Sequence, residues 1–349
     1  MTAAELDRHA RLEGCLLGTA IGDALLLPDE GLPRQRIRYG APLRHRLILG
    51  RGFISDDTEH AFLTAQAWLA AHGDDERFGA ALGWRLRGWL IGLPPGIGLA
   101  TLGACLRLCC GWSWGTAGVD SAGNGAAMRA AVLGAVLAEN PERRRRVVTT
   151  AARITHVHPL AVTAALAVAE TAAWLMGKNG DEDALVASWR SAGDDPVWTA
   201  AIITLIAARG RNEPVSGFAA ALGQPEFVSG YAGTSVPVAL YAWWRHRSDL
   251  PAALSAIRAC GGDVDSIGAI AGALSGMEGG VARCPPEWLG RLVDWPLSTR
   301  VLRRAATALA TGGPPVRWWW PLQPLRGVLV LLIVLGHGYG RVLRRCFGR

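Results

Sequence analysis

Two short acidic segments, more than two hundred residues apart in the chain, carry the side chains best suited to chemistry. Residues 55–58 read Ser-Asp-Asp-Thr, and residues 262–266 read Gly-Asp-Val-Asp-Ser. Carboxylate and hydroxyl oxygens are the ligands that Mg²⁺ and similar hard cations take in proteins, and Mg²⁺ usually keeps water or substrate oxygens in its remaining positions. If the two segments meet in the fold, they would therefore form an open metal site.

Helix capping is the alternative interpretation of each segment taken alone. Ser55 fits an N-cap, followed by Asp56, Asp57 and Glu59 in a first turn where acids favour the helix dipole. The second segment, however, opens a run of small residues at 267–274 that predicts a tightly packed, buried helix. Four carboxylates that meet there would repel one another and lose hydration unless cations neutralise them. Two divalent ions would balance four charges, and paired ions roughly 3.5 to 4 Å apart are an established catalytic device.

The elements that must position these side chains are expected to be helices. Ala, Leu and Arg dominate the periodic stretches, alternating Val and Ile runs are almost absent, and Gly or Pro clusters recur every fifteen to twenty residues. The pattern is typical of an all-α protein, with one compact multi-helical domain over residues 1–312 and a tail over residues 313–349. The expected helices span residues 8–27, 58–72, 77–90, 97–110, 126–139, 143–154, 159–176, 182–191, 196–208, 235–246, 250–260, 266–279 and 298–311.

Four connections carry more glycine and polar residues than a tight turn needs: residues 28–53, 111–125, 155–159 and 261–265. Binding residues often lie on such loops. In the second, residues 121–125 lead into a helix expected to begin at Ala126, so their backbone N–H groups could cradle a pyrophosphate. An ordinary glycine-rich turn is the alternative. His156, in the third, could be a ligand, a proton carrier or a hydrogen-bonding support. Gly96 and Gly98 are not expected to bind a nucleotide, because no strand precedes them.

The composition limits the classes of partner. The chain has 349 residues, half of them apolar, so a sizeable core is available. Its formal charge of +7 is concentrated in the tail, because the residues from Gly313 onward include six arginines and no acid. A near-neutral body does not favour a nucleic-acid partner. Seven cysteines without zinc-type spacing indicate reduced thiols, and the N-terminus lacks an apolar signal segment, so a cytoplasmic location is expected.

Five segments, in the same order along the chain, resemble the motifs of the ADP-ribosylglycohydrolase family. They read Gly-Cys-Leu-Leu-Gly through Gly-Asp-Ala-Leu at 14–25, Ser-Asp-Asp-Thr at 55–58, Gly-Asn-Gly-Ala-Ala-Met-Arg at 123–129, Thr-His-Val-His-Pro at 155–159, and Gly-Gly-Asp-Val-Asp-Ser-Ile at 261–267. The resemblance covers about residues 12–285, and five motifs in order are far more specific than any one of them.

The resemblance implies an all-α fold in which two Mg²⁺ ions, or Mn²⁺ in their place, lie in a cleft that binds ADP-ribose. The metal ligands that it implies are Ser55, Asp56, Asp57, Asp263, Asp265 and Ser266. The catalytic carboxylates that it implies are Glu30, Asp56, Asp57 and Asp265. The substrate contacts are Ser121, Gly123, Asn124, Gly125 and His156.

Glu30 stands where family members place an acid after the first motif, on what reads as an unstructured loop. Such a residue could approach or leave the metals. Leu26 replaces a glycine common in that motif, which leaves another path for this loop open.

The reaction implied by the resemblance is hydrolysis at the anomeric carbon of a ribose joined to an acceptor. The substrate would be an ADP-ribosylated protein side chain or a small ADP-ribose derivative. The alternative is a catalytically silent ADP-ribose-binding or structural protein on the same fold, which would be expected to lose ligands. All four aspartates and both hydroxyls are present, which favours the enzyme.

The tail has a composition of its own. Three tryptophans at 318–320 are followed by an apolar run at 328–335 and then by arginines. A helix from Gly327 to Gly340 would be about 21 Å long, short of a hydrocarbon core of about 30 Å. Its flanks suit a membrane surface, so peripheral membrane contact and docking on the domain or on a second subunit are both open.

Overall fold

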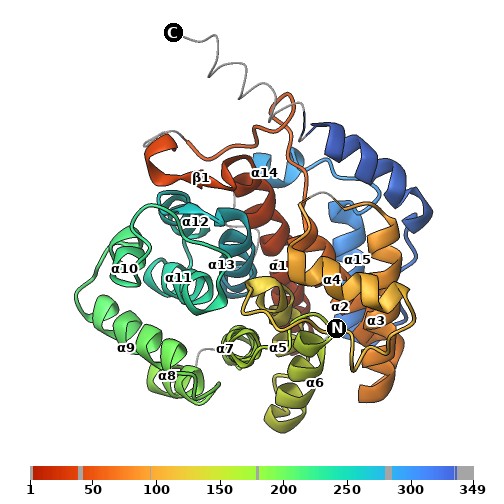
Figure 1. Ribbon diagram of the computed structural model, residues 1–349, viewed down its shortest axis with the longest axis horizontal. Helices are drawn as coiled ribbons and strands as arrows, with labels where there is room; N and C mark the ends of the chain where they lie inside the picture. The colour runs from red at the N-terminus through yellow and green to blue at the C-terminus, as the bar shows by residue number, and fades with distance from the viewer. Residues whose placement is uncertain are drawn as a thin grey trace.

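The computed structural model describes residues 3–37, 42–94, 96–177, 181–279, 285–333 and 335, and helices make up nearly all of their regular structure (Figure 1). The all-α prediction is confirmed. The α-helices are α1 Ala3–Leu26, α2 Asp56–Ala71, α3 Asp75–Ile91, α4 Leu99–Cys109, α5 Ala130–Val136, α6 Pro141–Arg153, α7 Pro159–Met176, α8 Glu182–Arg190, α9 Pro196–Gly210, α10 Val215–Ala221, α11 Ala232–Arg245, α12 Leu250–Arg258, α13 Val264–Gly279, α14 Pro286–Gly290 and α15 Thr299–Thr311.

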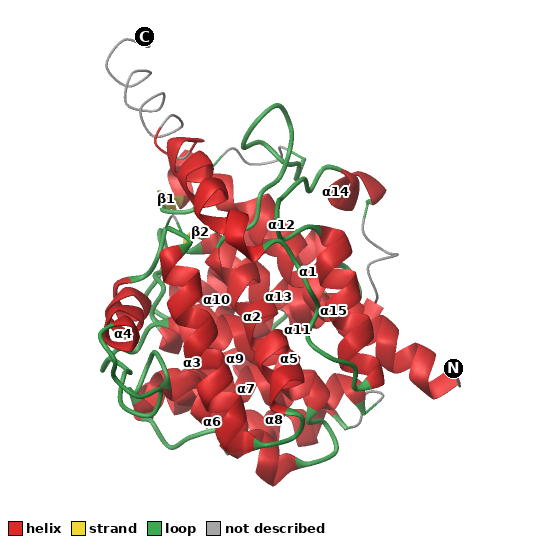
Figure 2. Cartoon of the chain, turned by 90° about the vertical axis from the view of Figure 1, so that its right-hand side faces the viewer, coloured by secondary structure: helices red, strands yellow, loops and turns green. Residues whose placement is uncertain are grey.

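Short elements complete the described part of the chain. The 3₁₀ helices are η1 Leu27–Asp29, η2 Arg34–Arg36, η3 Asn124–Arg129 and η5 Trp320–Leu322. Two strands, β1 Leu32–Pro33 and β2 Gly261–Gly262, pair antiparallel and lie together near one end of the helical body (Figure 2).

Local sequence rules explain where many of the helices begin. The Asp74, Asn140 and Asp249 side chains each accept a hydrogen bond from a backbone N–H in the first turn of the helix that follows. Proline occupies an early position in several helices, including α7 and α9, where the missing N–H has no helical partner to lose. These signals lie within a few residues of each helix start, so they can be read from the sequence.

Helices α1 and α13 lie at the centre of the fold (Figure 1), and a seam of glycines joins them. Gly14, Gly18 and Gly22 on α1 face Gly276, Gly272 and Gly268 on α13, respectively. A Cβ atom on Gly18 would lie 2.1 Å from the carbonyl oxygen of Gly272, so no larger side chain fits without separating the helices. Because the helices run antiparallel, the seam places the end of α1 beside the first turn of α13. Both acidic segments are positioned from this junction.

The central helix α7 is long and apolar enough to cross a bilayer, but most of its residues are buried inside the protein. Its small side chains pack against neighbouring helices, among them α5, α6 and α11. An all-round apolar helix is expected in the interior of a helical domain. The helix therefore has a sufficient explanation as the core of this fold.

The structure differs from the predicted helices in three respects. Helices α10 and α14, with seven and five residues, were not expected, because so short a stretch shows little periodicity. The helix predicted over residues 126–139 instead begins as the 3₁₀ helix η3, and α5 ends at Val136. The tail helix begins before residue 327, since the described residues from Trp320 to Ile333 are helical. The division of the chain at residue 312 stays a prediction.

Candidate active site

The first acidic segment forms the start of α2, with Ser55 as its N-cap. The Ser55 hydroxyl oxygen accepts a 3.3 Å hydrogen bond from the backbone N–H of Asp57. Asp23, at the end of α1, also supports this turn: its carboxylate accepts from Ser55 N at 2.9 Å and from both the hydroxyl and the backbone N–H of Thr58. Because Ser55 and Asp23 satisfy these donors, Asp56 and Asp57 are not needed as caps.

The second acidic segment meets the first at Asp57. The Ser266 hydroxyl donates to Asp57 Oδ2 at 3.2 Å, and the Ser55 hydroxyl donates to the same oxygen at 3.2 Å. One carboxylate oxygen of α2 therefore receives a hydroxyl from each segment. The two segments, distant in sequence, converge on one place in the fold.

The backbone just before α13 requires glycine. Gly262 has a φ of +89°, and a Cβ atom there would lie 2.1 Å from the carbonyl oxygen of Val228. The tight turn directs Asp263 back over Val228, whose carbonyl oxygen accepts from Asp263 N at 2.8 Å. On the other side, Gly31 N donates to Gly262 O at 2.9 Å. The neighbouring Glu30 is thereby tied to the second acidic segment.

The location of Glu30 differs from the expected unstructured loop. It directly follows the 3₁₀ helix η1 and precedes strand β1, whose pairing with β2 fixes the backbone path. Its neighbour Asp29 is buried and pairs with Arg46 and with Arg258, at 2.7 Å in the second case. Glu30 is therefore an exposed residue of the site that lies on an anchored turn and not on an unstructured loop.

A cavity of about 430 Å³ opens over these segments. Ten of the predicted residues line it, and they come from five separate parts of the chain: Glu30, Asp56, Ser121, Gly123, Asn124, Gly125, His156, Asp263, Asp265 and Ser266. Ser55 and Asp57 are buried beside the cavity and are not among its lining residues. One cavity thus brings four of the six predicted metal ligands together with all five predicted substrate contacts.

The electrostatics of this cavity favour a cation. Burial raises the pKa of Asp56, Asp57 and Asp265 well above the ordinary value, and the charges of neighbouring carboxylates raise each of them further. Burial likewise raises the pKa of Asp263, although the Asn124 amide, which donates to Asp263 Oδ2 at 2.6 Å, lowers it in part. Crowded buried carboxylates of this kind are stabilised by positive charge.

Two oxygen atoms of the cluster lack a partner within the described part of the chain. Asp57 Oδ1 and Asp265 Oδ1 are both buried without a hydrogen bond, which is costly for a carboxylate. Among the described residues, no group of three or more His, Cys, Asp or Glu side chains is gathered closely enough to hold a metal ion by itself. Hydroxyls and an incomplete shell suit Mg²⁺ or Mn²⁺, which keep water or substrate oxygens as further ligands. The donor set fits such an ion.

Two of the backbone N–H groups in residues 121–125, which were predicted to cradle a pyrophosphate, already have partners within the protein. Gly123 N donates to the Ser121 hydroxyl at 3.3 Å, and Asn124 N donates to Gly230 O at 2.9 Å, so neither N–H is left for a pyrophosphate. The segment also begins a 3₁₀ helix rather than an α-helix. Gly125 contributes through its lack of a side chain, because a Cβ atom at this position would lie 2.9 Å from His156 Cε1. The glycines leave room for the imidazole at the cavity wall.

A buried chain of hydrogen bonds orients His156. Arg129 Nη2 donates to the Thr155 hydroxyl at 2.6 Å, and that hydroxyl lies 2.8 Å from His156 Nδ1. Since Arg129 can only donate, this order favours Nδ1 as the acceptor and places the imidazole proton on Nε2. Burial, reinforced by the Arg129 charge, lowers the pKa of His156 to about 3. The ring is therefore a neutral hydrogen-bond donor at the cavity, while His158 caps α7.

Several contributors to the site were not found from the sequence. Asp23 lies within the first motif, but no local pattern indicates that it supports the first turn of α2. Gly96 and Gly98, which are not preceded by a strand and were not expected to bind a nucleotide, line the cavity together with Phe227 and Gly230. Gly96 and Gly98 could have been found from their position just before a helix. No local pattern in the sequence indicates a role for Phe227.

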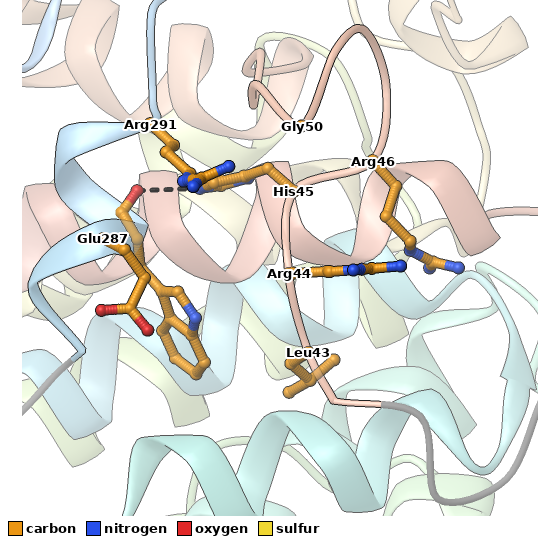
Figure 3. Close-up of a pocket in the computed structure, with 8 residues that line it drawn as sticks. Leu43, Arg44, His45, Arg46, Gly50, Glu287 and Arg291 are labelled. Carbon is orange, nitrogen blue, oxygen red and sulfur yellow. Dashed lines mark hydrogen bonds between the residues drawn. The ribbon is translucent and has the colours of Figure 1, made fainter.

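A second cavity, of about 560 Å³, lies between residues 43–50 and α14. Figure 3 shows Arg44 and Arg46 side by side in it, with the His45 ring next to Arg291. It contains no residue of the acidic segments, and its charge is mainly of the opposite sign. The larger cavity is therefore separate from the carboxylate chemistry.

Residues 4–315 match the model of the ADP-ribosylglycohydrolase family. This chain belongs to that family. An uncharacterized protein of Archaeoglobus fulgidus is 32% identical over 301 residues, which cover 81% of this chain and 92% of the relative. The ADP-ribosyl-[dinitrogen reductase] glycohydrolase of Rhodospirillum rubrum is 27% identical, over 87% of this chain and 97% of the relative. The ADP-ribosylarginine hydrolase Tri1 of Pseudomonas putida is 29% identical, over 82% and 74%.

The fold comparison agrees. A solved ADP-ribosylglycohydrolase-related protein complex superposes with a TM-score of 0.68 at 27% identity, covering 88% of this chain and 99% of the solved chain. The predicted family is confirmed, and with it the prediction that the protein is a hydrolase. The family match ends at residue 315, so most of the tail lies beyond it.

Proposed function

We propose that this protein hydrolyses the glycosidic bond between ADP-ribose and an acceptor in the 430 Å³ cavity. One observation carries the proposal: the crowded carboxylates of α2 and α13 open into the same cavity as Asn124 and the neutral His156. A site that pairs an acidic cluster with a neutral donor suits a ligand rich in hydroxyl groups. The family membership gives the same reaction class.

Two divalent ions, Mg²⁺ or Mn²⁺, fit the donor set. The residues that would hold them are Ser55, Asp56, Asp57, Asp263, Asp265 and Ser266. When bound, such ions neutralise the carboxylates, stabilise developing negative charge and lower the pKa of a water molecule. The two unpartnered buried oxygens, Asp57 Oδ1 and Asp265 Oδ1, are the observation in favour of this assignment.

The protein's own groups supply orientation and proton transfer. Asn124 is fixed against Asp263 by the 2.6 Å hydrogen bond, and His156 offers its Nε2 proton to a substrate oxygen. Phe227, at the cavity lining, presents an apolar ring that suits a base or a ribose face. Glu30, an exposed carboxylate at the opening, is placed to accept a proton from the attacking water. The reacting centre would be oxocarbenium-like, as in other glycosidic cleavages.

An ADP-ribosylated protein side chain is the proposed substrate, with arginine as the first acceptor to be tested. Two relatives are named for reactions on ADP-ribosyl dinitrogen reductase and on ADP-ribosylarginine, which supports this choice. A small ADP-ribose derivative would present the same ribose. A silent ADP-ribose-binding protein is the second candidate, favoured only if a ligand binds without turnover.

A release assay separates these candidates. Purified protein is incubated with arginine-linked and serine-linked ADP-ribosyl proteins and with small ADP-ribose derivatives, in Mg²⁺, in Mn²⁺ or in excess chelator, and free ADP-ribose is measured. We expect metal-dependent release, its loss in the Asp56→Asn/Asp57→Asn double variant, and its retention in the exposed Asp194→Asn control. Calorimetric binding of ADP-ribose without release on any acceptor would instead establish the silent protein.

A further inference from the structure

The chain beyond the family match packs on the helix that carries the first acidic segment. We call residues 316–326 the strap. At its start, Gln66 on α2 exchanges two hydrogen bonds with the backbone of Val316, at 2.7 and 2.8 Å. Trp318 then packs edge-on against Phe62 of the same helix, with 5.3 Å between ring centroids. Side chains about two and three turns into α2 therefore hold the strap in register.

Arg326, at the end of the strap, is 3% exposed and binds two carboxylates. Its guanidinium lies 2.9 Å from Glu59 Oε1 and 2.7 Å from Asp294 Oδ2. It also donates to the carbonyl oxygen of Ile54 at 2.6 Å, while Asp294 accepts from Ile54 N at 2.8 Å. Both backbone polar groups of Ile54 are thus held by this ion pair.

These contacts lie on either side of the metal-ligand turn. Ile54 immediately precedes Ser55, and Glu59 lies in the first turn of α2. Glu59 is further held by the indole N–H of Trp89 and by the Gln323 amide of the strap, each at 2.5 Å. One guanidinium from outside the family match therefore grips the segment that carries Asp56 and Asp57 at its beginning and at its first helical turn.

We propose that Arg326 is a positioning residue for the metal site, so that the strap determines how well α2 binds its ions. The proposal rests on the proposed function for the metal ligands as well as for the reaction. Without the guanidinium, the buried Glu59 and Asp294 carboxylates would be left unpaired, and breaking such a pair is strongly destabilising locally. Ile54 and the first turn of α2 would then shift, and supporting partners of this kind typically change metal affinity or activity by about 10- to 100-fold.

The test compares Arg326→Met, Arg326→Lys and the exposed control Arg300→Met in the full-length protein. Mn²⁺ binding is measured by calorimetry, and ADP-ribose release is measured as a function of Mn²⁺ concentration and of substrate concentration. For Arg326→Met we expect Mn²⁺ affinity and the half-activating Mn²⁺ concentration to worsen by at least about tenfold, with KM for the substrate at saturating Mn²⁺ nearly unchanged. Arg326→Lys, which keeps the charge, should restore part of the affinity.

The outcomes are distinct from a general loss of folding and from failure of the proposed function. Far-UV circular dichroism reports whether each variant keeps its helices, and if Arg326→Met does not fold, the lysine variant decides the matter. Wild-type protein that binds Mn²⁺ but releases no ADP-ribose overturns the proposed function and leaves the calorimetric comparison intact. Mn²⁺ binding equal in wild type and Arg326→Met, or absent in both, overturns the positioning role.

A different observation, the outward face of the tail helix, supports a second inference. Leu325, Leu329 and Leu332 are 61%, 52% and 61% exposed and follow one another at helical spacing, whereas Val330 on the opposite side is buried. The exposed Trp319 and Trp320 stand at the start of the same helix. The described part of the helix, Trp320–Ile333, is too short to span a bilayer. Its exposed apolar face is therefore expected to lie against a surface and not to cross a bilayer.

We infer that this face docks on an anionic lipid bilayer. The chain after residue 335 contains four arginines and no acid, a charge that complements anionic headgroups. The tryptophans suit the interfacial region, where an amphipathic segment lies in the plane of the membrane. Gly327 lies against the backbone of Gly92 and Leu93, so the tail helix packs on the end of α3, where Ile91 and Leu93 are also exposed.

Co-sedimentation with vesicles tests this inference. Full-length protein is mixed with phosphatidylcholine vesicles with and without phosphatidylglycerol, at low and at high salt. We expect binding to the anionic vesicles that weakens with salt and falls at least about tenfold in Leu329→Asp/Leu332→Asp, while Ile203→Asp, an exposed site on α9, binds as wild type does. Absence of vesicle binding by the wild-type protein overturns the inference. If the protein binds no vesicles and the double variant abolishes a dimer, the apolar face contacts a second copy of the chain instead.

Discussion

The Ser266 hydroxyl donates to Asp57 Oδ2 across 3.2 Å and joins α13 to α2 within the acidic cluster. A hydroxyl can relieve one carboxylate oxygen, but it carries no charge. The other oxygen of Asp57 remains buried without a hydrogen bond in the described part of the chain. The metal-free site is thus held together by polar contacts while it retains the repulsion of its carboxylates.

Removing one of these charges should stabilise the metal-free protein. We expect Asp57→Asn to raise the free energy of unfolding in excess chelator by about 1 kcal/mol, because the amide ends the repulsion with Asp56 and Asp263. The same substitution should abolish the stabilisation that Mg²⁺ gives to wild type. Urea unfolding with and without Mg²⁺ measures both effects. A loss of stability in chelator would mean that repulsion does not dominate at Asp57, and Asp194→Asn provides the exposed control.

The stability of the metal-free protein should fall as the pH rises. Burial raises the pKa of Asp23 from 3.8 to about 6, and that of Asp56, Asp57 and Asp265 well above the ordinary value. Between the unfolded and folded pKa values the folded protein binds more protons than the unfolded chain, so stability is present below that window and is lost through it. Melting temperatures in chelator across about pH 4 to 8 measure the slope.

Bound Mg²⁺ should reduce that loss, because it favours the ionised carboxylates. The Asp56→Asn/Asp57→Asn/Asp265→Asn variant should likewise show a flatter dependence. Equal slopes for this variant and for wild type in chelator would assign the pH dependence to other groups.

The glycine seam should be intolerant of even one methyl group. We expect Gly18→Ala to cost at least about 2 kcal/mol, because its Cβ would lie 2.1 Å from Gly272 O and the two backbones must separate. Gly88→Ala is the matched comparison, since Gly88 lies in α3 with no atom within 4 Å of the added Cβ. That change should be neutral or stabilising by up to about 1 kcal/mol. Urea unfolding of the two variants compares them directly, and similar results would contradict close packing along the seam.

His156 should act as a neutral donor and not as a titrating base. Its pKa of about 3 places the neutral imidazole across the whole working range. We expect His156→Leu to raise KM for the ADP-ribosyl substrate by about tenfold without changing the Mn²⁺ requirement, since one substrate hydrogen bond is lost. His156→Gln, which keeps a donor, should recover part of this. Initial rates across pH provide the check: disappearance of an acid limb in His156→Gln would assign a proton-transfer role to the imidazole.

The sequence was informative where local rules apply. Ser55 as an N-cap, the small residues of α13 and the start of α7 at Pro159 all follow from patterns of a few residues. Roles set by partners far away were not predictable in the same way. Asp23 supports α2 across more than thirty residues, and Arg326 reaches Glu59 across more than two hundred and sixty. The direction of the Asn124 N–H likewise depends on Gly230, which no local pattern indicates.

The strap also bears on how the protein is shortened in the laboratory. The end of the family match and the apolar tail invite truncation near Gly312 to improve expression. Such a deletion would take away Arg326 and Gln323 and leave Glu59 and Asp294 as buried charges without their main partners. A truncated protein with weak activity would then report a damaged active site rather than a missing anchor. Substitutions on the outward face of the tail, which leave Arg326 in place, separate the two effects.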